Sequence, residues 1–394
     1  MNKNFFHNTK QQIGFGFTCA MLTVSYTVCA CAVFGQSLLC AFLCCAVCFT
    51  ASLKFEDCVF APSALLLLPV FYIFADSSPV AVFISVTAGA VIFKLLTKFP
   101  KTIEIPDSVS AAATLSLAVG VTILLTNDYF GIGASGSTPI EMLKSYRSLG
   151  FHPNFRGLLY GTVTLFMMIT YPFKFRKANR YVPAEFITVF IPLVLNLFLN
   201  PQKELTTVNE VDFLTVAESV KNIPSPLSGF SSAEIPSIIK NAFATGFILF
   251  GCSSVKMHGK SEGMFVANAL SGAVSGLPLR RYGVRGYGAV SCITALTVSA
   301  VFLLLFPQLV LRLPVHSAGA MLIVSAWQNT PFKTIGSVFK THKIMPVAVF
   351  VVSTLPFIFT DIFTAVVIYL FIMFLCGKTH AFSKERSAAD EKIR

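Results

Sequence analysis

Charged residues are scarce in this chain. Only 12% of its 394 residues are Asp, Glu, Lys or Arg, about half of the share that soluble domains carry. Hydrophobic residues make up 55%, and they recur in runs of about 17 to 25 residues that fit transmembrane helices. The shortage of charge excludes an ordinary soluble protein. We therefore expect an all-α, polytopic integral membrane protein that is embedded in a lipid bilayer.

Groups for catalysis or metal binding are not gathered in any recognisable arrangement. The six histidines are scattered, and we interpret those near span ends, such as His316, as solvated. Eight of the eleven cysteines lie in the first 58 residues, inside apolar runs and without the histidine pairing of a zinc site. We interpret them as small hydrophobic residues. The sequence predicts neither an enzyme nor a cofactor or metal site.

About fourteen apolar runs can be separated along the chain, with boundaries uncertain by several residues. The first run leads straight into the next without a cleavage site, so we interpret it as a span rather than a signal peptide. The predicted spans are 11–34, 36–53, 58–75, 79–98, 106–126, 155–173, 181–199, 236–256, 262–276, 279–288, 289–306, 313–328, 344–359 and 361–377.

Basic residues lie in alternate loops. With the N-terminus in the cytoplasm, the basic loops near 94–101, 174–180, 256–260 and 333–343 all fall inside, as the positive-inside rule requires. The long loops 127–153 and 200–235 carry most of the acidic residues outside the spans and fall outside. Both termini are then cytoplasmic, with the chain in the cell (plasma) membrane. This distribution explains the net charge of +12 without a nucleic-acid partner.

The segment 276–288 combines three arginines with four glycines between two apolar runs. Charge at membrane depth is costly and marks functional sites, so one interpretation of this segment is half of an anion site. The alternative is an arginine-rich loop at the membrane surface. A second break, at 60–65, opens the third predicted span, where Pro62 suits the first turn of a helix. In two inverted seven-span repeats, the third and tenth spans are equivalent. We expect their helix N-termini to bind an anion with free N–H groups and a partial positive charge.

Carboxylates near membrane depth are few. Glu104, Asp107 and Asp361 lie at the ends of predicted spans. An arginine site without a facing carboxylate favours an anionic substrate, and it disfavours proton coupling through a carboxylate.

Several motifs from about residue 100 onward resemble the sulfate permease (SulP) family of inorganic anion transporters. Their order and spacing cover roughly two-thirds of the chain. They are Gly157-Leu-Leu-Tyr-Gly-Thr-Val-Thr-Leu with Lys174-Phe-Arg-Lys and Val182-Pro-Ala, then Ile223-Pro-Ser-Pro-Leu-Ser-Gly-Phe, Asn268-Ala-Leu-Ser-Gly-Ala-Val-Ser-Gly-Leu-Pro, Leu322-Ile-Val-Ser-Ala-Trp, and the segment from Thr354 to Asp361.

The resemblance implies two intertwined, inverted seven-helix repeats, at about 11–199 and 236–377, that divide into core and gate domains. The transmembrane transport domain would cover 1–377, followed by a short cytoplasmic tail at 378–394. The resemblance also implies a homodimer that moves anions by an elevator-like shift of the core. The substrate-binding residues carried over are Ser25, Tyr26, Pro62, Ser63, Ala64, Cys252, Ser253, Tyr282, Gly283 and Arg285.

The chain departs from the family pattern at several of these positions. Ser25-Tyr26 stands where the family usually has proline-glutamine, and Cys252 or Ser253 stands where bacterial members often have a glutamate. The segment from Pro278 to Pro307 is several residues short, so the site arginine aligns with either Arg285, which we favour, or Arg280. A C-terminal regulatory STAS domain is not expected here.

The expected function is secondary transport or exchange of small anions, of the sulfate, bicarbonate, chloride or dicarboxylate class. One alternative is a nucleobase or ascorbate carrier of the same fold, which Pro278-x-x-x-Tyr282-Gly also resembles, although such carriers need glutamates in the eighth and tenth spans. Another is a membrane scaffold that does not transport.

Overall fold

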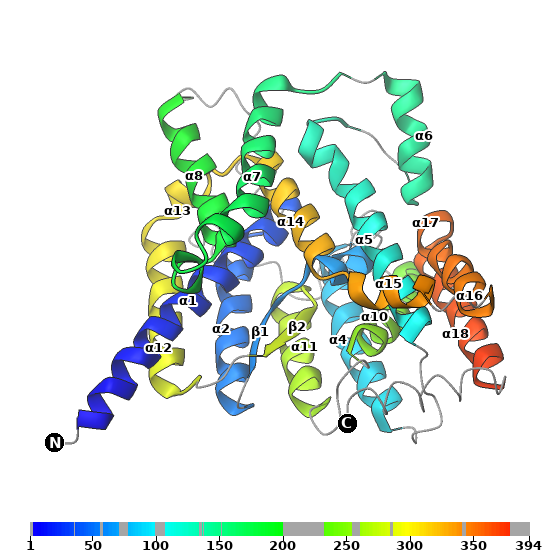
Figure 1. The fold of residues 1–394 in the computed structure, drawn as a ribbon, viewed down its shortest axis with the longest axis horizontal. Helices are drawn as coiled ribbons and strands as arrows, with labels where there is room; N and C mark the ends of the chain where they lie inside the picture. Colours follow the sequence, from blue (N-terminus) through cyan, green and yellow to red (C-terminus); the bar gives the residue numbers. More distant parts are fainter. Residues whose placement is uncertain are drawn as a thin grey trace.

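The computed structural model is a helical bundle that encloses a two-stranded sheet (Figure 1). It describes residues 3–34, 36–55, 58–70, 78–98, 107–133, 136, 138–150, 152–199, 232–253, 261–283, 287–340 and 344–378. The first half contains α1 (Lys3–Val33), α2 (Leu38–Lys54), β1 (Cys58–Pro62), the 3-10 turn η1 (Ala64–Leu66), α4 (Pro79–Lys98), α5 (Asp107–Phe130), α6 (Pro139–Leu149), α7 (Phe155–Lys174), η2 (Ala178–Arg180) and α8 (Ala184–Leu199).

The second half begins with η4 (Ser232–Glu234), α10 (Ile235–Ser253), α11 (Ser261–Ser275) and β2 (Leu279–Gly283). It continues with α12 (Ala289–Ala300), which runs into the π-helical turn η6 (Val301–Leu305) and the short α13 (Pro307–Val310). The last helices are α14 (Val315–Gln328), α15 (Phe332–Lys340), α16 (Ile344–Thr354), α17 (Pro356–Phe359) and α18 (Ile362–Lys378).

Three of the described helices are long and apolar enough to cross a membrane: Thr9–Val33, Val80–Thr97 and Ser108–Phe130. Other apolar helices, such as Leu38–Lys54 and Ala184–Leu199, are shorter. Two buried hydroxyls on α1 are satisfied within the helix, since Ser25 and Thr27 donate to the carbonyls of Met21 and Thr23, each at 2.7 Å. These bonds pair both hydroxyls without water.

Local signals explain where several helices begin and end. The Ser37 side chain accepts the Cys40 N–H and starts α2, as an N-cap residue does. Gly276 has a φ of 63°, and its N–H donates to the Ser271 and Gly272 carbonyls at the end of α11. A glycine in this left-handed conformation ends a helix without a Cβ clash. The chain can therefore reverse and enter β2.

The short helix α6 lies outside the predicted spans and packs on the end of α5. The Tyr146 hydroxyl donates to Asn127 Oδ1 at 2.6 Å. Burial, and then the neighbouring Asp128 carboxylate, raise the pKa of Tyr146 to about 12. The phenol therefore stays protonated and keeps donating.

The sheet corrects two predicted spans. Residues 58–62, assigned to the third predicted span, form the strand β1, and helical structure begins only at Ala64. Residues 279–283, assigned to the tenth, form β2, so the prediction of a helix over 279–288 was wrong there. The strands pair antiparallel along their whole length, and each satisfies those backbone groups of the other that face it inside the protein. The chain is mostly helical rather than all-α.

The helices fall into two packed groups. One group contains α1, α2, α4, α10, α11 and α12 around the strand pair, and the other contains α5, α7, α8, α14, α16, α17 and α18. The contacts of the two halves of the chain correspond: α10 packs on α4 as α1 packs on α12, α11 on α4 as α2 on α12, α7 on α14 as α16 on α5, and α18 on α10 as α8 on α1.

Small residues allow close helix contacts in the first group. A Cβ added at Gly16 of α1 would lie 2.4 Å from the Ser291 carbonyl oxygen of α12. A Cβ at Gly246 of α10 would lie 2.7 Å from the Gly89 carbonyl oxygen of α4. Such glycines are common where membrane helices approach closely.

Candidate functional site

The strand pair places an arginine-tyrosine segment inside the bundle. Its register sets Pro62 opposite Leu279, Ala61 opposite Arg280 and Val59 opposite Tyr282. The start of β2 is held by Asn268 of α11, whose side chain accepts the Leu279 N–H at 2.7 Å and donates to the Leu279 carbonyl at 3.1 Å. These bonds fix β2 against α11, directly across from the end of β1.

Two buried hydroxyls lie at this end of the strand pair. Ser63, the residue before η1, is 0% exposed, and its hydroxyl does not cap the turn. Ser63 Oγ and the Tyr282 hydroxyl both lack a hydrogen-bond partner within the described residues. Ser63 and Asn329 are polar neighbours of the Tyr282 hydroxyl. A buried hydroxyl without a partner is costly, so the pair can donate to a ligand.

Tyr26 of α1 joins this segment to the second group of helices. Its ring stacks on the ring of Tyr282, with centroids 6.5 Å apart. Its hydroxyl accepts a hydrogen bond from Ser325 Oγ of α14 at 2.8 Å and donates to Glu185 Oε1 of α8 at 3.5 Å. One tyrosine therefore contacts β2, α8 and α14.

Arg280 supplies positive charge beside these hydroxyls. Its Nη1 donates to Asn329 Oδ1 at 2.9 Å, and Asn329 is itself held by a 2.8 Å bond to the Ser325 carbonyl. Within the described part of the chain, the ion pair present is Lys94 with Glu262, elsewhere in the bundle. The half-buried Arg280 therefore has no carboxylate in direct contact among the described residues.

The structure brings together some of the predicted site residues. Tyr26, Ser63 and Tyr282 meet at the strand pair, with Pro62 and Ala64 flanking Ser63. Gly283 lies at the far end of the pair, opposite Cys58. The Ser25 hydroxyl is bonded to its own helix. Cys252 and Ser253 end α10, but their side chains, like the whole of Arg285, lie outside the described residues.

A tenth-helix N-terminus does not lie at this site. The helix that follows β2 is α12, and its N-cap Gly288 lies against Gln12 of α1. Gln12 precedes Tyr26 by 14 residues on α1, which is about 21 Å along the helix axis. Strand β2 therefore occupies the position where we expected a helix N-terminus.

Two residues contradict the sequence interpretation. Glu185, the second residue of α8, lies inside the predicted span 181–199 and contacts Tyr26, so the site has a facing carboxylate. The Pro-Ala-Glu sequence at the start of that span was a signal for it. His316, expected to be solvated, is 1% exposed, because it packs where Gly157 and Gly131 leave room for the imidazole.

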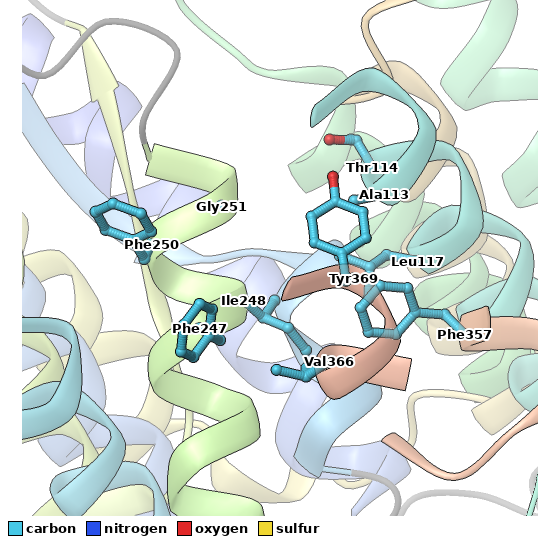
Figure 2. Close-up of a pocket in the computed structure, with 10 residues that line it drawn as sticks. All are labelled: Ala113, Thr114, Leu117, Phe247, Ile248, Phe250, Gly251, Phe357, Val366 and Tyr369. Atoms are coloured by element: carbon cyan, nitrogen blue, oxygen red, sulfur yellow. The ribbon is translucent and has the colours of Figure 1, made fainter. Parts of the chain in front are cut away.

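The cavities elsewhere do not suit a charged ligand. Figure 2 shows an apolar cavity bordered by α5, α10, α17 and α18, with aromatic side chains such as Phe247, Phe357 and Tyr369 around it. The Tyr369 hydroxyl is already bonded to the Val109 carbonyl. A cavity of about 270 Å³ between α1, α8, α12 and η6 is lined by Phe17, Met21, Phe186 and Phe302. Neither has a charged lining residue.

Motifs that could indicate other chemistry lack the required context. Gly259-Lys-Ser-Glu-Gly263 has the spacing of the hydrolase motif G-x-S-x-G. That motif needs a strand-to-helix turn; Gly259 and Lys260 lie outside the described residues, and the described element before them is α10. Cys45 and Cys48 have the spacing of a C-x-x-C motif, but both are buried and neither forms a disulfide. No cluster of three or more His, Cys, Asp or Glu that could hold a metal occurs among the described residues.

A helical bundle with a strand pair inside it is the fold class that these observations define. Its fold is that of the transmembrane domain of SulP (SLC26) anion transporters. The transmembrane domain of a cyanobacterium bicarbonate transporter, BicA, matches with a TM-score of 0.66 and 14% identity, over 95% of this chain and 98% of that one.

SLC26A9 matches with a TM-score of 0.68 and 12% identity, over 92% of this chain and 64% of that one. The structure of a murine Slc26a9 anion transporter in the inward-facing state matches with a TM-score of 0.68 and 12% identity, over 93% of this chain and 68% of that one. At these identities the likeness establishes the fold. No family model matches the sequence, and no curated protein does either. The proteins that share the fold are transporters rather than enzymes.

Proposed function

We propose that this chain is a secondary transporter or exchanger of small anions, which it binds between η1 and β2. The observation that carries the proposal is a pair of buried hydroxyls, on Ser63 and Tyr282, that make no regular hydrogen bond among the described residues and lie near Arg280. Hydroxyl donors and a guanidinium suit an anion, because hydrogen bonds to charged groups are the strong ones. Tyr26 completes one wall of the site.

The substrate class follows from the chemistry of the donors. Hydroxyls and a guanidinium can donate hydrogen bonds to sulfate, bicarbonate, chloride and dicarboxylates alike. The similar structures include a bicarbonate transporter and an anion transporter, which supports an inorganic or carboxylate anion here. In this proposal the site is bordered by Pro62, Ala64, Gly283 and the end of α10 at Cys252 and Ser253. Arg285 adds to the positive electrostatic potential.

Transport would proceed by an elevator-like shift of one helix group against the other. The corresponding contacts in the two halves of the chain support two inverted seven-helix repeats, at about 11–199 and 236–377. The group around the strand pair would be the core and the other group the gate. Tyr26 on the core and Glu185 and Ser325 on the gate would separate when the core moves.

The remaining architectural predictions belong to the same proposal. They are fourteen crossings, cytoplasmic termini, the cell membrane as location, a homodimer, and a transport domain over 1–377 with a tail at 378–394. The basic loops that alternate along the chain support the orientation.

The proposal is tested with purified protein in liposomes, by the flux of chloride, sulfate, bicarbonate and oxalate. Tyr282→Phe removes one donor to the anion. Losing a hydrogen bond to a charged group costs about 1.5–3 kcal/mol, so the concentration for half-maximal flux should rise about 10- to 100-fold. Ser63→Ala should act in the same direction, and Arg285→Ala should weaken uptake.

Ser25→Ala is the matched control, because the Ser25 hydroxyl lies next to Tyr26 in sequence but is bonded to the Met21 carbonyl. Its flux should equal that of the wild type. Equal flux for Ser25→Ala and Tyr282→Phe would place the anion elsewhere. Well-folded wild-type protein without flux of any anion would instead support a scaffold that does not transport, and binding of uracil or xanthine would support a nucleobase carrier.

A further inference from the structure

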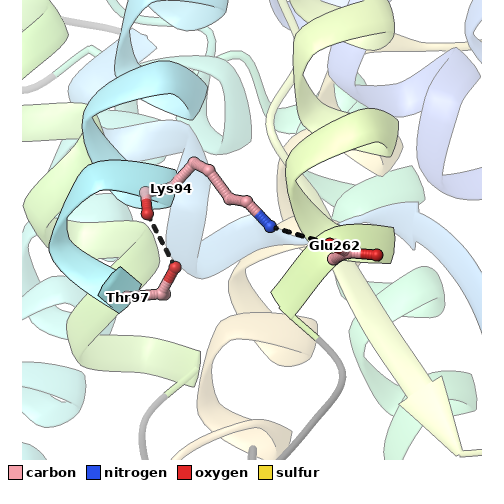
Figure 3. Close-up of polar contacts among 3 residues, drawn as sticks. All are labelled: Lys94, Thr97 and Glu262. Atoms are coloured by element: carbon pink, nitrogen blue, oxygen red, sulfur yellow. Dashed lines mark hydrogen bonds and ion pairs between the residues drawn. The ribbon is translucent and has the colours of Figure 1, made fainter. Parts of the chain in front are cut away.

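Glu185 is a carboxylate at the boundary between the two helix groups. It lies in the first turn of α8 and is half buried, and its Oε1 is 3.5 Å from the Tyr26 hydroxyl. Its situation differs from that of Glu262, which is 78% exposed and 3.4 Å from Lys94 (Figure 3). Among the described residues no cation pairs with Glu185. It is a half-buried carboxylate within the predicted span 181–199, without a salt bridge among the described residues, and an ionisable group in such a place is a candidate functional group.

The groups around Glu185 come from several elements. Tyr26 faces it from α1, and Tyr282 of β2 is close enough for electrostatic interaction. Arg280 interacts with Tyr282 in turn, and α14 contributes the neutral Ser325. The cations in the turn between α7 and α8 are exposed and form no ion pair with Glu185 within the described chain; they are Lys174, Arg176, Lys177 and Arg180.

Glu185 and a bound anion would compete for the single hydroxyl proton of Tyr26. The Tyr26 hydroxyl has one proton, and because Ser325 Oγ already donates to its oxygen, that proton is directed to Glu185. An ionised Glu185 holds the proton and repels an approaching anion. A neutral Glu185 removes the negative charge and leaves the Tyr26 proton free to turn towards an anion beside Tyr282.

We propose that Glu185 is a proton-binding site that couples proton movement to anion transport. This inference rests on the anion site proposed above. The carboxylate takes a proton from a hydronium ion on one side of the membrane: one O–H bond of the hydronium breaks as the carboxyl O–H bond forms. On the other side the carboxyl O–H bond breaks and the proton returns to water. Proton and anion then bind cooperatively. The hydrogen bond from core to gate at Tyr26 forms when both ligands have left.

The test measures uptake of radiolabelled chloride and sulfate into liposomes with and without an acidic exterior. Wild-type uptake should rise several-fold with the gradient. Glu185→Gln has nearly the same shape but cannot titrate, so it should keep anion exchange at equal pH and lose the response to the gradient. Glu262→Gln, the same change at an exposed carboxylate, should behave like the wild type.

A second readout does not depend on flux. Sulfate should raise the melting temperature of the purified wild-type protein more at acidic than at neutral pH, and Glu185→Gln should show equal shifts at both. A gradient response in Glu185→Gln, or none in a wild type that exchanges anions, would overturn the proton site and leave the anion site standing. A wild type without any anion flux would overturn the anion site and, with it, this inference.

Discussion

Arg280 and Tyr282 share one face of β2, while Arg281 lies on the other, because side chains alternate along a strand. Arg280 is bonded to Asn329, next to the Ser63 and Tyr282 hydroxyls. At the scale of single residues, this alternation separates Arg280 from Arg281 as candidate partners of the proposed anion. The alignment to the SulP pattern left Arg280 and Arg285 open; the strand places Arg280 beside these hydroxyls, and Arg285 lies outside the described residues.

Arg280→Gln should therefore raise the anion concentration for half-maximal flux by about tenfold or more, since the lost interaction involves a full charge. Arg281→Gln removes the same charge from the opposite face and should change this value much less. The measurement is concentration-dependent flux in liposomes for both variants at matched protein density. Equal impairment of the two variants would contradict the assignment of faces.

The polar residues of the site could be found from the sequence only in part. Ser63 and Tyr282 followed from breaks in apolar runs and from the SulP resemblance. Glu185 was missed because a single carboxylate near a predicted span end reads as a surface residue. Its contact with Tyr26 depends on the packing of α8 against α1, which no local pattern records.

At the scale of elements, the strand pair was hidden for a different reason. Five-residue strands such as β1 and β2 exist because they pair with each other, and an isolated strand pair has little stability of its own. Most helices were predicted close to their observed bounds, since apolar runs of membrane length need only local hydrogen bonds. The strand pairing joins residues more than 200 positions apart, beyond the reach of any periodicity.

Helix packing at this scale is testable with two glycines on α1. Gly16→Ala places a Cβ 2.4 Å from the Ser291 carbonyl oxygen of α12, so a backbone must shift, at a cost of about 1–3 kcal/mol. Gly14→Ala meets nothing within 4 Å and should be neutral, or stabilising by up to ~1 kcal/mol. Thermal unfolding of the purified variants measures both. A lower melting temperature for Gly14→Ala than for Gly16→Ala would contradict this packing.

At the scale of the whole molecule, the two helix groups meet where α1 packs on α8 and α14 and where α10 packs on α18. Tyr26 bridges them through Glu185 and Ser325, and Phe186 of α8 lies against Phe302 of η6, with ring centroids 6.0 Å apart. The apolar cavity of about 270 Å³ lies at the same boundary. In the transport mechanism proposed above, one group would slide past the other at this boundary.

If the groups move as proposed, a link between Phe186 and Phe302 should stop transport. The Phe186→Cys/Phe302→Cys pair, joined by a short bifunctional thiol reagent, should lose most of its flux and recover it when a cleavable link is reduced. Phe186→Cys/Phe190→Cys is the control, because these rings are 5.6 Å apart on the same helix and their link spans no moving boundary. The variants with one added cysteine, treated with the same reagent, show whether a native cysteine takes part in the link. The described native cysteines are mostly buried. Full flux through the linked Phe186–Phe302 protein would rule out relative motion of the two groups at this point.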